Sequence, residues 1–468
     1  MNYISDVKQP SGIQAINRFV ASPLYIVLIM GLSAVANIFQ AELPVYTLYT
    51  AAAVYTCLFG ADLSPLMPIV LACYIAPSAA NNPGYSADSL FYGVGGSYIA
   101  LLVVCIIGAL LYRIIRQPKG IYPGKSKLLF GLLLLGGAYM LSGIGSAAYP
   151  DFLAKNLLFA LIQSVSLLFP YWLFSRYVDW KAIRPDYMAW IGLGLGMAMA
   201  AQILGICLFQ DVFIYGVVWR VNFYTGWGMA NNIAFMQILA IPSAFYIALR
   251  YRRAWIGPLL GVIFMVSACM TYSRNALLFG TLIYIICALL TLRYTPGQKS
   301  YRIVLLGIVL SVVAVLLVFH KQLARVFSVL LYKGLDLSHR DEFFKEGMKL
   351  FSQWPIFGCS FFSPGYQPWG WSIVESFSGF FPPRWHSTIV QLFASCGLVG
   401  VAAYGFHRAQ TLLVFWKKRS KENVFLHCTV FIILACSLLD SHFFNVGPTL
   451  FYSMVLAFNE HCPEEINI

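Results

Sequence analysis

Three arginines and one histidine are the residues of this chain most suited to chemistry, because only 10% of its 468 residues are charged. Arg274 lies between two apolar runs, Arg220 lies in a polar segment, and Arg340 and His386 belong to a long polar and aromatic stretch. A guanidinium binds phosphate through paired hydrogen bonds, and an imidazole accepts a proton near neutral pH. Together they predict a site that holds a diphosphate leaving group and deprotonates a hydroxyl nucleophile.

Each of these residues also has an ordinary structural explanation. Arg274 could be a span-end residue whose side chain extends to the membrane surface, and Arg220 could be a loop arginine. A histidine at the start of a helix, such as His386, is more often structural than catalytic. Their occurrence together on one predicted side of a membrane is what favours the site.

Four further polar residues are placed to support such a site. Asn231 and Asn232 open an apolar run, where amide groups and the N–H donors of a helix N-terminus favour anions. Asp440 and His442 follow a later run, and they could either support the site or simply end the run. No metal site is predicted, because the histidines show no zinc-ligand spacing and neither HExxH nor a Walker loop occurs.

Membrane-spanning helices must position these residues, since 60% of the chain is apolar, against about 45–50% in a soluble domain. A span needs about 17–25 mostly apolar residues. Segments of this kind lie near 22–40, 43–61, 66–81, 93–113, 127–148, 155–175, 187–209, 228–249, 254–271, 275–293, 303–320, 387–415, 424–440 and 446–458. Because none shows β-barrel alternation, they predict an all-α polytopic membrane protein with about 12–14 transmembrane helices.

The basic residues predict the orientation of this bundle. Most of the 31 lysines and arginines fall in alternate short loops, which indicates that these loops and the N-terminus are cytoplasmic. The net charge of +13 therefore reflects membrane topology and not binding to nucleic acid. Arg220, Arg274, Arg340 and His386 stand on the opposite, extracytoplasmic side.

Residues 321–385 are predicted to form one large extracytoplasmic loop. It separates an N-terminal part, 1–320, with about eleven spans, from a C-terminal part, 386–468. A loop of this length is usually functional or disordered, and its tryptophans and phenylalanines argue against disorder. Within it, the segment SHRDEFFKEGMKLFSQ predicts an amphipathic helix along the outer membrane surface. The residues from Pro355 to Pro383 predict irregular structure that returns to the membrane.

Three motifs occur in a fixed order in the second half of the chain. The first is MTYSRNALL at 270–278, and the second is Arg340 followed by the turn sequence Trp354-Pro-Ile-Phe-Gly358. The third is His386-Ser387, followed nine residues later by Gly397-Leu-Val-Gly400. In this order they resemble the motifs of the O-antigen ligase and polymerase superfamily of bacterial membrane glycosyltransferases. Two positions depart from that family's pattern, with Asn275 where Gly or Ala is common and Ser387 where Asn is common.

The resemblance implies a GT-C-like helical fold that acts on the outer face of the bacterial plasma membrane. It implies a glycan donor carried on undecaprenyl diphosphate, a glycan or lipid-linked acceptor, and no cofactor, nucleotide sugar or metal. It assigns His386 as the base, and Arg274, Arg340 and Arg220 as the groups that hold the diphosphate. It also admits contacts with other polysaccharide-assembly proteins, such as a flippase and a chain-length regulator.

Two glycines of the third motif are expected to have a structural role. Gly397 and Gly400 would let a neighbouring helix approach closely beneath His386.

The residues leave three functions open. The favoured one is a polysaccharide polymerase that joins lipid-linked repeat units into O-antigen, capsule or exopolysaccharide with inversion. The alternative is a ligase that transfers the finished glycan to a lipid, protein or wall acceptor. A flippase for lipid-linked glycans is a further alternative, although a transporter would be expected to bury charges in mid-bilayer and to show internal repeats.

Overall fold

The structure is a computed structural model of the whole chain. It describes residues 11–77, 93–122, 126–148, 151, 153–209, 213–214, 217–218, 230–271, 273–318, 340–362, 385–418 and 420–461. Almost all of these residues are helical; a two-residue antiparallel pair, β1 (Phe213–Ile214) with β2 (Val217–Val218), is an exception. Residues 1–10 and most of the predicted loop 321–385 lie outside the described ranges.

The first half of the chain forms a succession of apolar helices. They are α1 (Ser11–Val20), α2 (Pro23–Phe39), α3 (Glu42–Phe59), α4 (Leu66–Ile75), α6 (Gly93–Arg116), α7 (Leu129–Leu141), the 3₁₀ turn η1 (Ser142–Ala148), α8 (Leu153–Tyr177) and α9 (Tyr187–Phe209). Ser22 caps α2 with its side chain and Pro23 opens it, a combination that favours a helix start.

The second half supplies the helices around the predicted site. They are α10 (Ala230–Leu239), α11 (Ile241–Arg250), α12 (Ile256–Met270), α13 (Arg274–Tyr294), α14 (Lys299–Val318), α16 (Arg340–Gln353), α18 (Thr388–Lys417), α19 (Lys421–Leu439), the 3₁₀ turn η4 (His442–Phe444) and α20 (Val446–His461). Pro242 directly follows the break between α10 and α11, where it removes a helical N–H donor.

Each of the fourteen predicted spans contains a helix within the described residues, and residues 340–353 of the predicted amphipathic segment form α16. Among the described residues, six helices are long and apolar enough to cross a membrane, or seven if the bent pair α1 and α2 is one span. Several of the other predicted spans form shorter helices, so the count of 12–14 transmembrane helices is not confirmed. The architecture is that of an all-helical, multi-pass membrane protein.

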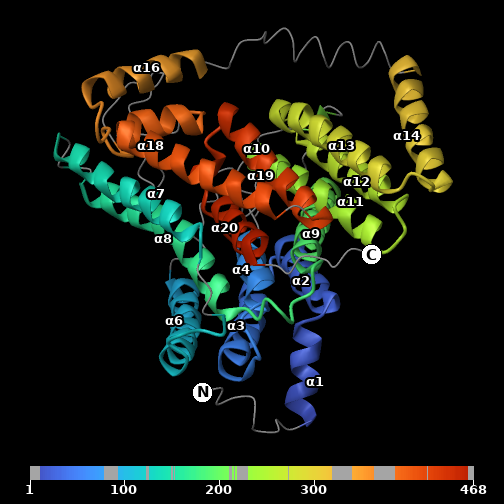
Figure 1. Cartoon of the computed structure of the whole chain (residues 1–468), viewed down its shortest axis with the longest axis horizontal. Helices are drawn as coiled ribbons and strands as arrows, with labels where there is room; N and C mark the ends of the chain where they lie inside the picture. Colours follow the sequence, from blue (N-terminus) through green and yellow to red (C-terminus); the bar gives the residue numbers. More distant parts are fainter. Residues whose placement is uncertain are drawn as a thin grey trace.

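The helices pack in two groups around a central one (Figure 1). α7 and α8 lie side by side next to α18, α10 to α13 form a second group, and α19 and α20 lie between the groups. α16 crosses above the start of α18 and packs against it. The start of α18 and the ends of α10 and α19 that face it therefore meet close to α16, and this is the region that holds the predicted histidine.

A sharp break in α18 at Gly397 shapes this region. Gly397 has φ of 61° and ψ of −158°, a combination that is essentially restricted to glycine. The break leaves the carbonyls of Ala394 and Ser395 without the N–H groups of Leu398 and Val399, which would be their partners in a continuous helix.

The turn that follows α16 satisfies all four of these groups. Cys359 and Ser360 donate their N–H to the carbonyls of Ala394 and Ser395, at 2.8 and 3.0 Å. Leu398 and Val399 donate theirs to the carbonyls of Pro355 and Ile356, at 2.9 and 3.2 Å. Irregular backbone is tolerated among membrane helices only when its polar groups are satisfied in this way.

This crossing corrects the expectation for the two glycines. The neighbour at Gly397 is a turn and not a helix, because a Cβ there would lie 2.4 Å from the carbonyl oxygen of Ile356. At Gly400 the nearest atoms belong to Cys396 and Leu392 of α18 itself. The turn continues inward, where Phe361 and Phe362 are buried in the core and Asn156 of α8 hydrogen-bonds both backbone groups of Phe362.

Arg408 is a charged residue within the predicted span 387–415. It lies inside α18, where its guanidinium packs over the rings of Tyr404, Phe443 and Tyr452 at 4.5, 4.8 and 4.8 Å. Stacking on aromatic faces stabilises a cation in an apolar environment. Arg408 thereby anchors η4 and α20 to α18.

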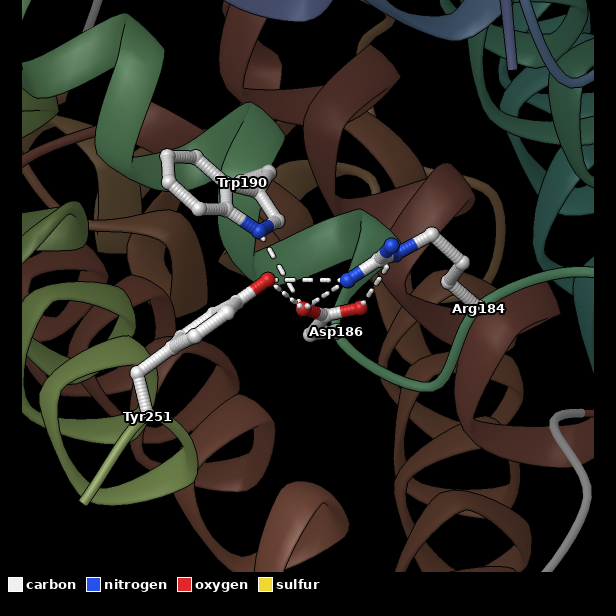
Figure 2. Close-up of polar contacts among 4 residues, drawn as sticks. All are labelled: Arg184, Asp186, Trp190 and Tyr251. Carbon is white, nitrogen blue, oxygen red and sulfur yellow. Dashed lines mark hydrogen bonds and ion pairs between the residues drawn. The ribbon is translucent and has the colours of Figure 1, made fainter. Parts of the chain in front are cut away.

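At the other end of the bundle, Asp186 ties the start of α9 to the end of α11 (Figure 2). Its carboxylate accepts two hydrogen bonds of 3.0 Å from Arg184, one of 2.9 Å from Tyr251 and one of 3.2 Å from Trp190. Arg184 precedes α9, Trp190 lies in its first turn, and Tyr251 follows α11. Burial alone would raise the pKa of Asp186, but the bonds and charge of Arg184, together with the bonds from Tyr251 and Trp190, lower it.

Candidate functional site

His386 is held directly before the first turn of α18. Ser387 caps the helix by accepting a hydrogen bond of 3.4 Å from the N–H of Val390, and Gln391 accepts one of 3.1 Å from the N–H of Trp385. Trp385 is buried against α16. His386 itself has a φ of 50°, a left-handed conformation that is uncommon for a residue other than glycine. The cap and the buried Trp385 on either side hold it there.

A buried carboxylate lies beside this histidine. Oδ1 of Asp440 is 3.6 Å from Nδ1 of His386, and Oδ2 is 3.9 Å from Nε2 of His442. The side chain of Asp440 is 9% exposed and that of His386 is 34% exposed. The carboxylate therefore lies between two imidazoles, of which only that of His386 is substantially exposed to solvent.

The end of α19 places Asp440 in this position. α19 ends at Leu439, and the backbone of Asp440 is extended. The side-chain carboxylate of Asp440 accepts a hydrogen bond of 2.7 Å from the N–H of Ser441. η4 follows immediately, and Arg408 holds η4 from below through Phe443. The sequence suggests Asp440 and His442 only as a possible support, and the structure brings both next to His386.

α10 forms another wall of the site. The ring of Phe235 stacks on His442 with centroids 4.1 Å apart and planes 2° from parallel. One turn earlier, Asn232 accepts a hydrogen bond of 3.4 Å from the side chain of Asn445. Asn231 is the preceding residue, in the first turn of α10. The two asparagines therefore lie at the same end of the bundle as His386.

α16 covers His386 from the side of the long loop. The ring of Phe343 lies 5.2 Å from the imidazole of His386. Gly347 allows this approach, because a Cβ there would lie 2.6 Å from a methyl group of Val390 in α18. Arg340 is the first residue of α16, one turn before Phe343, so its backbone begins next to the site.

Arg274 is the first residue of α13, and it is exposed. Gly280 of α13 faces Ile238 of α10, and further along the ring of Tyr284 lies 5.3 Å from that of Phe245 in α11. Residue numbers rise together along the two sides of this contact, from Gly280 to Tyr284 in α13 and from Ile238 to Phe245 in α10 and α11. α13 therefore runs parallel to α10 and α11. Arg274 therefore lies at the end of the bundle where α10 begins, which is the end that holds His386.

The structure thus brings together most of the predicted residues. His386, Asp440 and His442 are in one cluster, and Asn231, Asn232, Arg274 and the backbone of Arg340 lie at the same end of the bundle. Arg220 lies outside the described residues. The sequence did not assign Phe235 and Phe343 to the site. In a sequence, a phenylalanine that lines a site looks the same as one that packs in the hydrophobic core.

The arrangement suits general base chemistry. A carboxylate behind an imidazole orients the ring and stabilises its protonated form. The 3.6 Å separation needs a shift of well under 1 Å to reach a hydrogen bond of about 2.9 Å. Among the described residues, no group of three or more His, Cys, Asp or Glu side chains is placed to hold a metal ion.

Comparison with known proteins adds no family assignment. No protein-family model matches the chain, and no curated protein matches it in sequence. The function of the protein is therefore inferred from the residues of the site and from their geometry.

Proposed function

We propose that the protein is a membrane glycosyltransferase that uses a polyprenyl-diphosphate-linked glycan as donor and joins repeat units as a polysaccharide polymerase. One observation carries the proposal. A partly exposed histidine stands 3.6 Å from a buried aspartate, at the end of the bundle where Arg274 begins its helix. A base oriented by a carboxylate and a nearby arginine are the two groups that such a transfer needs.

In this reaction the acceptor hydroxyl attacks the anomeric carbon of the donor. His386 takes the hydroxyl proton as the new C–O bond forms, and Asp440 stabilises the imidazolium that results. The bond from the anomeric carbon to the diphosphate breaks, and its electron pair leaves with the diphosphate. Arg274 and Arg340, with Arg220, compensate the negative charge that develops there. A single displacement of this kind inverts the anomeric centre.

The end of the bundle with His386 faces the outside of the bacterial plasma membrane in this proposal. The support is the distribution of charge. The opposite end carries the short basic segments, among them Arg250 to Arg253 at the end of α11 and Lys417 to Lys421 between the end of α18 and the start of α19. Positive loops remain on the cytoplasmic side.

The proposal is tested with His386→Ala, which should lower chain extension by about 10²- to 10⁴-fold, the usual contribution of a general base. The assay is extension of a defined undecaprenyl-diphosphate oligosaccharide by purified full-length protein in detergent. Asp440→Asn should lower the rate less, because the imidazole remains. Full activity of His386→Ala would refute the assignment of the base.

Arg274 has a matched control on the same helix. Arg274→Ala should abolish extension, whereas Arg293→Ala, which removes the same charge from the exposed opposite end of α13, should leave it unchanged. Equal activity of the two variants would contradict the role of Arg274.

The product of a deletion strain separates polymerase from ligase and flippase. Single repeat units on the acceptor are expected for a polymerase. Long chains that stay on the undecaprenyl carrier would instead identify a ligase. Repeat units trapped on the cytoplasmic side would identify a flippase.

A further inference from the structure

A cavity of about 310 Å³ lies at the end of the bundle opposite His386. His386 precedes the first turn of α18, and the cavity lies at the last turns of that helix, where they meet the start of α7 and the end of α20. Its polar lining consists of Tyr122, Lys127, Gln410, Lys417, Lys418 and His461, together with Glu460. The cavity is therefore separate from the site proposed for glycosyl transfer.

The lining is positively charged. Lys127, Lys417 and Lys418 bring three positive charges to the cavity, and Glu460 is the one acid among its described lining residues. The carboxylate of Glu460 is already engaged, because it accepts hydrogen bonds from the N–H groups of Lys127 and Leu128 and from the hydroxyl of Tyr171. Glu460 thus caps the start of α7 and leaves the excess of positive charge in place.

One buried ring nitrogen among the lining residues has no hydrogen-bond partner among the described residues. It is Nε2 of His461, a residue that is only 8% exposed. The imidazole of His461 is fixed between the rings of Tyr122 and Trp180, with centroids at 5.4 and 5.5 Å. Buried polar atoms are nearly always paired, so an unpaired nitrogen on a residue that lines a cavity is a potential donor to a bound group.

The electrostatics of His461 agree with an anion at this position. Burial lowers the pKa of His461 to about 4, and the positive charges of Lys418 and Lys127 contribute to the decrease. The imidazole is therefore neutral at pH 7, and a neutral imidazole still donates one hydrogen bond. A negative group between the lysines would accept that bond and compensate their mutual repulsion.

We propose that this cavity binds a phosphate group. Its volume is at the lower end of the range for small-ligand pockets, roughly 300–1,000 Å³. Basic pockets between helices at the cytoplasmic surface bind the phosphates of anionic lipid headgroups. A lipid phosphate and a free phosphate share this chemistry, and the test distinguishes them.

The test measures the thermal unfolding of purified full-length protein in detergent. Phosphatidylglycerol, phosphatidylcholine and inorganic phosphate are added separately. An increase in Tm with phosphatidylglycerol alone identifies a lipid phosphate, and an increase with inorganic phosphate as well identifies a site for the free anion. If neither phosphatidylglycerol nor inorganic phosphate raises Tm, the proposal is overturned.

Two sets of variants tie the response to the cavity. The double variant Lys127→Ala, Lys417→Ala should weaken the apparent affinity at least tenfold. Lys181→Ala removes a charge from an exposed loop outside the cavity and should leave the affinity unchanged. An unchanged affinity of the double variant overturns the proposal.

A pH titration keeps the proposal testable if the double variant does not fold. The charged and titratable groups that face His461 are Lys127, Lys417 and Lys418, with Glu460 and Tyr122. A bound anion raises the pKa of His461, so the affinity for phosphatidylglycerol should increase roughly threefold or more from pH 7 to pH 5. His461→Asn should abolish that increase, and its persistence would overturn the proposal.

Discussion

Substitution of Gly397 by alanine tests whether the crossing of α18 by the turn after α16 holds this end of the bundle together. The φ of 61° and ψ of −158° at Gly397 are unfavourable for any residue with a Cβ. The added methyl group would lie 2.4 Å from the carbonyl oxygen of Ile356 and 2.7 Å from the N of Gly358. Both atoms belong to backbone, so the turn itself has to move.

The expected cost follows from these two effects. The backbone strain amounts to about 1–3 kcal/mol. Movement of the turn also weakens the four hydrogen bonds that join residues 355–360 to 394–399, each of which contributes about 1 kcal/mol. Gly397→Ala should therefore destabilise the protein by about 1–7 kcal/mol, depending on how many of the four bonds are lost.

Gly405→Ala is the matched control, because Gly405 lies in the same helix and a Cβ there meets no atom within 4 Å. It should be neutral or stabilising by up to about 1 kcal/mol. Thermal unfolding in detergent compares the two variants, and hydrogen exchange of peptides covering 355–360 and 394–399 locates the change. If Gly397→Ala unfolds at the wild-type temperature with unchanged exchange, the crossing does not have the role inferred for it.

Three further predictions concern the opposite end of the bundle. Asp186→Asn should lower stability by about 2 kcal/mol in thermal unfolding, because it weakens the bonds from Arg184; the surface change Glu346→Gln should have no measurable effect. Because the pKa of His461 is about 4 in the fold and 6.5 when unfolded, stability should decrease as pH falls from about 6.5 to 4. His461→Asn should flatten this profile, and an identical profile would contradict it. Glu460→Gln should lower the free energy of unfolding by about 1–2 kcal/mol through loss of the charged cap on α7, and so lower Tm, whereas an unchanged Tm would show that the cap is not needed.

Much of the fold follows from the pattern of apolar residues. Runs of about 20 such residues predict helices whatever their partners are, since each helix satisfies its own backbone. The cap at Ser387 is a local effect of the same kind, and it fixes where His386 stands relative to α18. The number of true spans is harder to predict, because several apolar runs form helices too short to cross a membrane by length alone, among them α4, α7 and α12.

The candidate site shows what the sequence could not predict. Asp440 is separated from His386 by more than fifty residues, and only the packing of α18 against α19 brings its carboxylate within 4 Å of that imidazole. Sequence distance contains no information on such a contact. The surroundings of Arg408 could not be predicted for a similar reason, since its stabilisation comes from three rings on α18, η4 and α20 that meet only in the fold.

The sequence by itself therefore determined the class of protein and the side chains suited to chemistry, because hydrophobicity and residue type act locally. It showed that charge is scarce and that a few arginines and a histidine stand outside the basic loops. Only the tertiary structure decided which of them share a site, and that Gly397 breaks a helix to accept a turn. These outcomes depend on contacts between distant segments, and such contacts form only when the whole bundle packs.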